Sequence, residues 1–302
     1  MKNYSDYPDD SAPYSRTRRP IKKRKRLKLR LIITALLVLT IGGITIDSNT
    51  RIQVEYPVIQ VAKPLGSFDG YSVAVVSDVH NKQFGRESEK LLRLISDAKP
   101  DMIAVTGDLI DGKGQIPRAV ELAKKLLEIA PVYFISGNHE FATKEHRDLF
   151  QALRDIGVVV LRNQIDRIYA EGDSGEHITI VGIDDPQGPA DMKTPAQVFA
   201  QLTDDDRAGL VLTLVHRNFY LRDFAPLGTD VILCGHAHGG VVRLPFLPQG
   251  IWAQTGFFPK ETGGLFTYGS TSMYVSRGLG NVYGIPRFMN NPHLPVVILK
   301  GA

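Results

Sequence analysis

Polar residues that bind metals or transfer protons follow five of the short apolar segments in this sequence. They occur in the patterns Asp-x-His, Gly-Asp-x-x-Asp, Gly-Asn-His-Glu and Gly-His-x-His, and as one further histidine. The residues are Asp78, His80, Asp108, Asp111, Asn138, His139, His216, His236 and His238. Carboxylates, imidazoles and a carboxamide, without thiolates, form a donor set that suits borderline divalent ions such as Mn, Fe or Zn.

The number of these residues predicts more than one ion. Each motif alone has an ordinary interpretation, because Gly-Asp and Gly-Asn form turns and Asp-x-His can cap a helix. Five such motifs in succession, each after a predicted strand, are not expected by coincidence. Seven candidate ligands are too many for one tetrahedral ion. They suit two ions that share a bridging carboxylate, an arrangement used for in-line attack on phosphorus.

The apolar segments that precede these motifs have the length and composition of buried strands. They are residues 72–77, 102–106, 132–136, 210–215 and 231–234. Helical spacing of apolar residues occurs at 88–98, 117–129, 144–156 and 195–202. Further strands are expected at 52–56, 158–161, 177–183, 273–276 and 296–299. This order predicts a layered α/β domain whose functional loops follow the carboxyl ends of the strands.

Charge is distributed unequally along the chain. The formal net charge is +4, but residues 1–46 alone carry a net +8, so the remaining residues sum to −4. The main domain therefore lacks the basic character typical of nucleic-acid binding, and no nucleic-acid partner is expected. The single cysteine, Cys234, excludes an internal disulfide. It is expected to be a small core residue, with a thiolate ligand as the alternative.

The N-terminal region predicts a membrane anchor. Ten basic residues between Arg16 and Arg30 are followed by an uncharged segment, 31–46. Residues 1–26 are expected to form a disordered basic cytoplasmic tail, 27–46 a transmembrane signal anchor, and 47–69 a linker with the first strand. The main domain, 70–302, would then lie outside the cytoplasm at the cell membrane. A buried helix, a cleaved signal sequence and a solvated tail are the alternatives, and Thr17-Arg18-Arg19 faintly resembles a twin-arginine signal.

Together, the motifs resemble those of the calcineurin-like metallophosphoesterases. The resemblance covers residues from about 70 to the C-terminus, and the segments 239–245, 258–260 and 276–280 are similar to the membrane-associated YkuE-type branch. It implies a four-layer α/β fold of two packed mixed β-sheets flanked by helices, with the metals between the strand-end loops. Asn218 and Val241 stand where this branch often has Pro and Gln. Neither is a ligand, so these departures bear on substrate choice.

The resemblance also implies a role for each site residue. One metal would be held by Asp78, His80 and His238, and the other by Asn138, His216 and His236. Asp108 would bridge the two metals, and a metal-bound hydroxide would attack the phosphorus. His139 would protonate the leaving oxygen and Asp111 would orient it, with a structural salt bridge as the alternative for Asp111. Asp184-Asp185-Pro186 and Arg277 are expected in turns and at the surface rather than facing the substrate.

The resemblance and the anchor together predict a membrane-anchored hydrolase of a phosphomonoester or phosphodiester. A phosphate linked to a lipid or to the cell wall is the candidate substrate. A non-catalytic metal-binding sensor or interaction module on the same fold is the alternative, because a fold does not determine a function. A membrane-bound nuclease is disfavoured, because the basic tail would lie across the bilayer from the domain.

Overall fold

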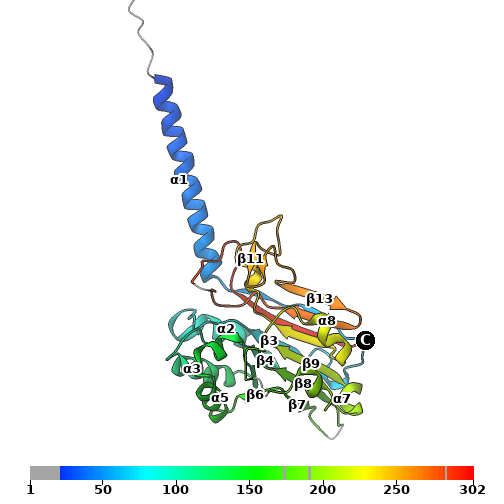
Figure 1. Cartoon of the computed structure of the whole chain (residues 1–302). Coiled ribbons are helices and arrows are strands. Elements are labelled where there is room, and N and C mark those ends of the chain that lie inside the picture. The colour runs from blue at the N-terminus through cyan, green and yellow to red at the C-terminus, as the bar shows by residue number, and fades with distance from the viewer. Residues whose placement is uncertain (1–20, 173–174, 190–191, 283) are drawn as a thin grey trace, which may run out of the picture. The chain divides into compact units, whose positions relative to one another are not determined.

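The structure, a computed structural model, describes residues 21–172, 175–189, 192–282 and 284–302, with only the backbone described for residues 21–24. The chain divides into two units, residues 1–43 and residues 44–302. Helix α1 (Ile21–Thr50) forms the described part of the first unit and continues into the second (Figure 1). Among the described residues, α1 alone is long and apolar enough to cross a membrane, a test that an N-terminal signal sequence also passes.

Helix α1 begins earlier than the predicted anchor. Residues 21–26 of the predicted disordered tail are helical. The rest of that tail, and with it Thr17-Arg18-Arg19, lies outside the described residues.

The first sheet carries three of the five strand-end motifs. Its strand order is β1-β15-β3-β4-β5-β6, with β2 paired to β15. The strands are β1 (Gln53–Glu55), β2 (Val58–Gln60), β3 (Ser72–Val76), β4 (Met102–Thr106), β5 (Val132–Ile135), β6 (Val159–Val160) and β15 (His293–Lys300). Strands β3 to β6 are parallel neighbours, and β15 is antiparallel to β3.

The second sheet carries the other two motifs. Its strand order is β13-β14-β10-β9-β8-β7. The strands are β7 (Gln164–Tyr169), β8 (His177–Ile183), β9 (Leu210–Val215), β10 (Val231–Cys234), β13 (Gly264–Tyr268) and β14 (Thr271–Val275). The central strands β8, β9, β10 and β14 are parallel, and both edge strands are antiparallel. Strands β11 (Trp252–Ala253) and β12 (Gly256–Phe257) form a separate pair.

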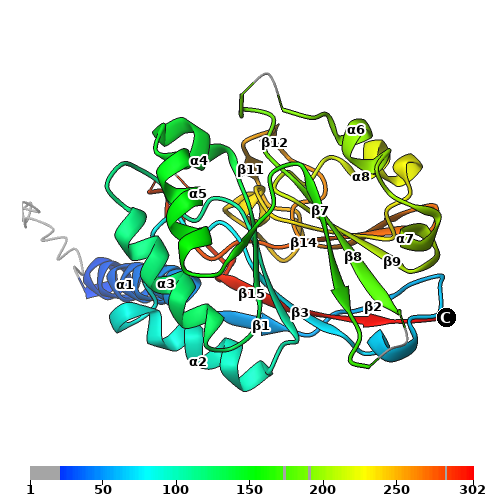
Figure 2. The ribbon, with the colours of Figure 1, turned by 90° about the horizontal axis from the view of Figure 1, so that it is seen from below.

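Alternation of side chains along the strands builds four layers. In β3, Val73 and Val75 face a core between the two sheets, whereas Ala74 and Val76 pack in the core with the helices on the outer face. Those helices are α2 (Glu89–Ala98), α3 (Ile116–Leu127), α4 (Asn138–Thr143) and α5 (His146–Asp155). The second sheet is covered by α6 (Pro195–Phe199), α7 (Asp204–Ala208) and α8 (Leu221–Phe224), on the other side of the molecule (Figure 2). The predicted four-layer α/β fold is therefore confirmed.

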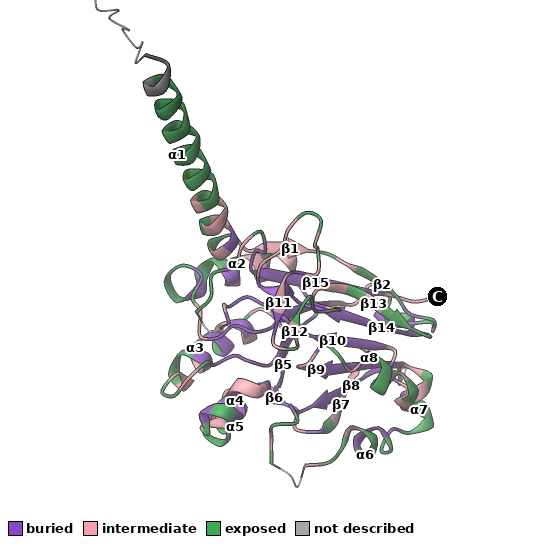
Figure 3. Ribbon diagram, turned by 45° about the horizontal axis from the view of Figure 1, so that its top comes forward, coloured by how far each residue is buried: buried purple, intermediate pink, exposed green. Residues whose placement is uncertain are grey.

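Buried elements follow the sequence prediction more closely than exposed ones. The strands predicted at 177–183, 210–215 and 231–234 have the observed bounds, and Cys234 is a fully buried core residue. The edge strands β7 and β13 were not predicted, because they are only partly buried and mix polar with apolar residues (Figure 3). The helix predicted at 144–156 begins at His146, and a separate short helix, α4, precedes it.

Candidate metal centre

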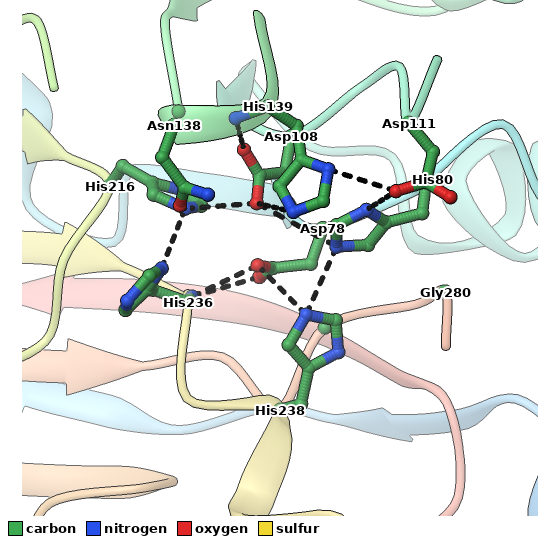
Figure 4. Close-up of polar contacts among 12 residues, drawn as sticks. Asp78, His80, Asp108, Asp111, Asn138, His139, His216, His236, His238 and Gly280 are labelled. Atoms are coloured by element: carbon green, nitrogen blue, oxygen red, sulfur yellow. Dashed lines mark hydrogen bonds and ion pairs between the residues drawn. The ribbon is translucent and has the colours of Figure 1, made fainter. Parts of the chain in front are cut away.

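All nine predicted site residues meet at one edge of the two sheets. Strands β3, β4 and β5 are parallel neighbours, as are β9 and β10 in the second sheet. Parallel neighbours end at the same edge of a sheet, so the residues that follow them converge. Figure 4 shows these side chains pointing toward one another from loops of both sheets.

The backbone at this edge adopts a conformation that residues with side chains usually avoid. Five of the seven predicted ligands have positive φ angles, between 47° and 69°. They are Asp78, His80, Asp108, His236 and His238. Left-handed backbone costs about 1–2 kcal/mol per residue other than glycine. Such strain is typical of functional sites, where the surrounding structure maintains it.

The first cluster of donor atoms consists of Asp78, His80 and His238. Nε2 of His238 lies 3.0 Å from Nε2 of His80 and 3.4 Å from Oδ1 of Asp78. All three residues are buried, and their donor atoms lie within 4.8 Å of one another. Two imidazole nitrogens at this distance need a cation or a proton between them.

The second cluster consists of Asp108, His216 and His236, together with Asn138. Nε2 of His216 lies 3.0 Å from Nδ1 of His236, 3.2 Å from Oδ1 of Asn138 and 3.2 Å from Oδ2 of Asp108. The other ring nitrogen of His216, Nδ1, donates to the carbonyl oxygen of Thr106 at 2.8 Å. That hydrogen bond orients the ring and leaves Nε2 as the nitrogen that faces the cluster.

Asp108 lies between the two clusters. Its Oδ2 atom is 3.2 Å from Nε2 of His216 and 3.7 Å from Nε2 of His80. The oxygen is buried, and its nearest polar neighbours are these two imidazoles, one from each cluster. A buried carboxylate oxygen between two sets of metal-ligating donors is costly without a positive charge beside it, so this position fits a bound cation. The two clusters and the shared oxygen together fit two divalent ions.

His139 and Asp111 lie beside the ligands. Nδ1 of His139 is 2.9 Å from Oδ1 of Asp111, and its Nε2 is 3.9 Å from Oδ2 of Asp108. Oδ1 of Asp111 also lies 3.1 Å from Nδ1 of His80, so one carboxylate contacts two imidazoles. His139 remains partly exposed, as does Asn138, whereas the other six predicted ligands are buried.

The electrostatics of the second cluster favour a positive charge. Burial lowers the pKa of His216, but the Asp108 carboxylate outweighs this effect and raises the pKa to about 10. Burial and the adjacent His216 lower the pKa of His236 to about 2. The negative charge that holds a proton on His216 would also attract a divalent cation, which competes with that proton for the same nitrogen.

Glu140 holds two of the ligand loops together, a role that the sequence motif did not reveal. Its carboxylate accepts hydrogen bonds from the backbone N–H groups of Gly137, Asp108 and Leu109 at 2.7–2.9 Å, and from that of Ile110 at 3.3 Å. Burial and Asp108 raise the pKa of Glu140 to about 7, although backbone N–H donors stabilise its ionised form. The signal in the sequence is a glutamate three residues after the Gly137 N-cap of α4.

Arg287 is a second supporting residue that sequence analysis missed. It is fully buried, and its Nη2 lies 3.2 Å from Nδ1 of His238. The same guanidinium donates to the carbonyl oxygens of Arg277, Gly278 and Gly280. No local pattern identifies this residue, because it reaches His238 across 49 positions of sequence.

The expected surface positions of Asp184, Asp185 and Arg277 are wrong, because all three are buried. Asp184 pairs with Arg162 at 2.7 Å, and Asp185 pairs with Arg217 at 2.6 Å. Arg277 donates to Glu55 and Gln53 on β1. Each buried charge is compensated by a partner distant in sequence, which the local turn pattern did not indicate.

Comparison with known proteins identifies a family and several relatives of this chain. The family model described as calcineurin-like phosphoesterase matches residues 71–240. A Danio rerio "Transmembrane protein with metallophosphoesterase domain" is 27% identical over 292 residues, which cover 91% of this chain but only 62% of that protein. "Uncharacterized metallophosphoesterase YkuE" of Bacillus subtilis is 31% identical, over 77% of this chain and 80% of its own. "Phosphodiesterase YaeI" of Escherichia coli is 27% identical, over 71% and 77%.

The matched region contains the whole set of predicted metal ligands. Residues 71–240 make up more than half of the chain and include both donor clusters. The predicted resemblance is therefore confirmed, and the chain belongs to the calcineurin-like phosphoesterase family.

Proposed function

We propose that this chain is a membrane-anchored, metal-dependent hydrolase of phosphate esters. The observation that supports this most directly is Oδ2 of Asp108, a buried oxygen that lies between two sets of imidazole and carboxylate donors. Asp78 and Asp108 are both fully buried. Two buried carboxylates close together are costly unless positive charge compensates them, and bound cations would supply that charge.

The proposal assigns each ligand to one of two ions. Asp78, His80 and His238 would hold the first, Asn138, His216 and His236 the second, and Asp108 both. When bound, two such ions would supply a water of lowered pKa and positive charge to neutralise phosphoryl oxygens. Hydrolysis breaks the bond between phosphorus and the leaving oxygen, which then needs a proton.

His139 is the proposed donor of that proton. It is the least buried of the histidines in the cluster, so a substrate oxygen can approach its ring. The Asp111 carboxylate, 2.9 Å from its Nδ1, orients the ring and directs Nε2 toward the space beside Asp108. Asp111 thus acts through His139 and is a positioning residue.

The proposed location is the cell membrane, with α1 as a single span. The part of the chain that follows α1, which we call the catalytic unit, would lie outside the cytoplasm. The apolar helix and the names of the transmembrane relatives support the span, and the basic residues that precede it support the orientation. A lipid-linked or wall-linked phosphate is the proposed substrate class. Protease added to sealed cells should cleave the chain after Asp47, and full protection there would exclude this topology.

Hydrolysis of a soluble bis-aryl phosphate by the full chain in detergent tests the activity. Asp108→Asn preserves the shape of the side chain but removes the shared charge, so metal-dependent turnover should fall to background. Asp97→Asn on the exposed surface of α2 is the matched control and should keep the wild-type rate. Turnover by Asp108→Asn at the wild-type rate would refute the assignment, whereas metal binding without turnover on any phosphoester would favour the sensor alternative.

Metal content distinguishes the two proposed ions. His236→Ala and His238→Ala should each lower the metal content from two ions per chain to one, because their rings face different clusters. His146→Ala, a histidine on α5 outside both clusters, should keep both ions. Loss of both ions in each of the two variants would instead indicate one cooperative site.

A further inference from the structure

Three phenylalanines of the catalytic unit are unusually exposed. Phe246, Phe257 and Phe258 are 82%, 74% and 67% exposed. Among the described residues after α1, no other large apolar side chain is as exposed. Isolated exposed apolar residues need no explanation, but three aromatic rings within 13 positions indicate an interaction surface.

The loop that carries these rings has no charged residue. Residues 244–259 contain no Asp, Glu, Lys, Arg or His, although charged residues make up 23% of the whole chain. About four would occur in a stretch of this length at the average frequency, and loops facing water are usually polar. Strands β11 and β12 lie within this loop and occupy one end of the catalytic unit in Figure 1.

A second loop, residues 284–291, adjoins the first. The backbone N–H of Arg243 donates to the carbonyl oxygen of Phe288 at 3.0 Å, and that of Ile251 donates to Val242 at 2.9 Å. Ile285 and Met289 on the second loop are 39% and 41% exposed. We use the term aromatic surface for Phe246, Phe257, Phe258, Ile285 and Met289.

The second loop also holds the end of α1. Asn49 donates to the carbonyl oxygen of Arg287 at 2.9 Å and accepts from the Arg287 N–H at 3.0 Å. Ile46 is the last residue of the uncharged segment, and Asn49 lies three positions after it. At 1.5 Å per helical residue, the second loop holds the chain about 5 Å from the end of that segment. If α1 spans a bilayer, covalent connectivity alone keeps this loop at the bilayer boundary.

We propose that the aromatic surface docks onto the bilayer and inserts its side chains into the interfacial layer. An uncharged loop with exposed phenylalanines has the chemistry that this layer accepts, and the one charged residue between Ile285 and Met289, Arg287, is buried. The anchor keeps both loops within reach of this layer. The proposal rests on α1 being membrane-spanning and not on the proposed hydrolysis. It has a consequence for the metal centre, because Asn290 of the second loop donates to the carbonyl oxygen of His238 at 2.8 Å. Docking would therefore hold the His238 loop close to phosphate groups at the membrane surface.

The only tryptophan of the chain, Trp252, reports on this surface. It pairs with Phe257 across β11 and β12. The full chain should be reconstituted at high lipid dilution into phosphatidylcholine vesicles with brominated or unbrominated acyl chains, since bromine quenches indole emission only at short range. We expect loss of Trp252 emission in the brominated vesicles. Equal emission in the two vesicle types would overturn the proposal, as would quenching that appears only when chains are concentrated enough to self-associate.

In the triple variant Phe246→Ser, Phe257→Ser and Phe258→Ser, Trp252 emission in brominated vesicles should return to the level seen in unbrominated vesicles. Its thermal unfolding midpoint should match that of the wild type, because the three side chains contribute little to the core. Tyr169→Ser on β7, where the ring is also exposed, is the control and should remain quenched. Quenching that persists in a folded triple variant would show that the phenylalanines do not mediate docking. Hydrolysis of soluble phosphate esters is a separate measurement, so failure of one proposal leaves the other standing.

Discussion

Replacement of Glu140 by glutamine is expected to loosen two ligand loops without changing any ligand. Oε2 accepts from Asp108 and Gly137, and Oε1 accepts from Leu109 and Ile110. A glutamine amide would turn one of these oxygens into a donor, so two buried N–H groups would face an N–H group. Each unsatisfied buried donor costs about 1–3 kcal/mol, which gives a loss of about 2–6 kcal/mol. Domains are usually stable by about 5–15 kcal/mol, so the variant should fold.

Amide hydrogen exchange of the metal-free full chain in detergent measures this effect locally. A loss of 2 kcal/mol corresponds to about thirtyfold faster exchange, since about 1.4 kcal/mol is a factor of ten. Peptides covering 107–111 and 137–141 should show this increase, whereas β9 and β10 should change little. Glu121→Gln on the exposed face of α3 is the control. Exchange in the two loops within about threefold of the wild type would show that Glu140 does not hold them.

Two further substitutions test the packing of the site and the stability of the second sheet. Gly235→Ala should abolish metal binding, because a Cβ there would overlap the Ser77 hydroxyl and the Asp78 carboxylate; normal metal content of the purified variant would contradict this. Asp206→Asn should lose about 1–3 kcal/mol at pH 7, because the buried carboxylate accepts two hydrogen bonds from Arg167. Arg167 holds the pKa of Asp206 below its ordinary value of 3.8, so the stabilisation is fully present above about pH 4 and decreases at lower pH. Urea unfolding should therefore show a larger difference between wild type and variant at pH 7 than at pH 3, and an equal difference at both would refute the ionic explanation.

The sequence identified the candidate site because its residues directly follow buried strands. A strand covered on both faces is a continuous apolar segment, as in 231–234, so the polar residue that ends it is conspicuous. The parallel order of β3, β4 and β5 then brings such residues together without any contact having to be predicted. The same logic fails for β7 and β13, whose partly exposed positions mix polar and apolar residues. Their pairing is determined by neighbouring strands rather than by local composition.

The supporting contacts could not be predicted, because each joins residues whose proximity depends on the whole fold. Glu140 reaches Asp108 across 32 positions, and Arg287 reaches His238 across 49. A pattern of residue types contains no information about which distant carbonyl or imidazole a buried side chain will meet. The buried positions of Asp184 and Arg277 were missed for the same reason, since their compensating partners lie elsewhere in the sequence.

The separation of His236 from His238 illustrates what the backbone adds to the sequence motif. In an extended strand, side chains two residues apart share a face, and both rings would then point toward one position. Here both residues have left-handed backbone, with φ of 69° and 48°. His236 consequently faces His216 at 3.0 Å, and His238 faces His80 at 3.0 Å. The left-handed backbone of this short turn thus directs the two rings of the His-x-His motif to different donor clusters. The regular geometry of an extended strand would direct both rings to the same side.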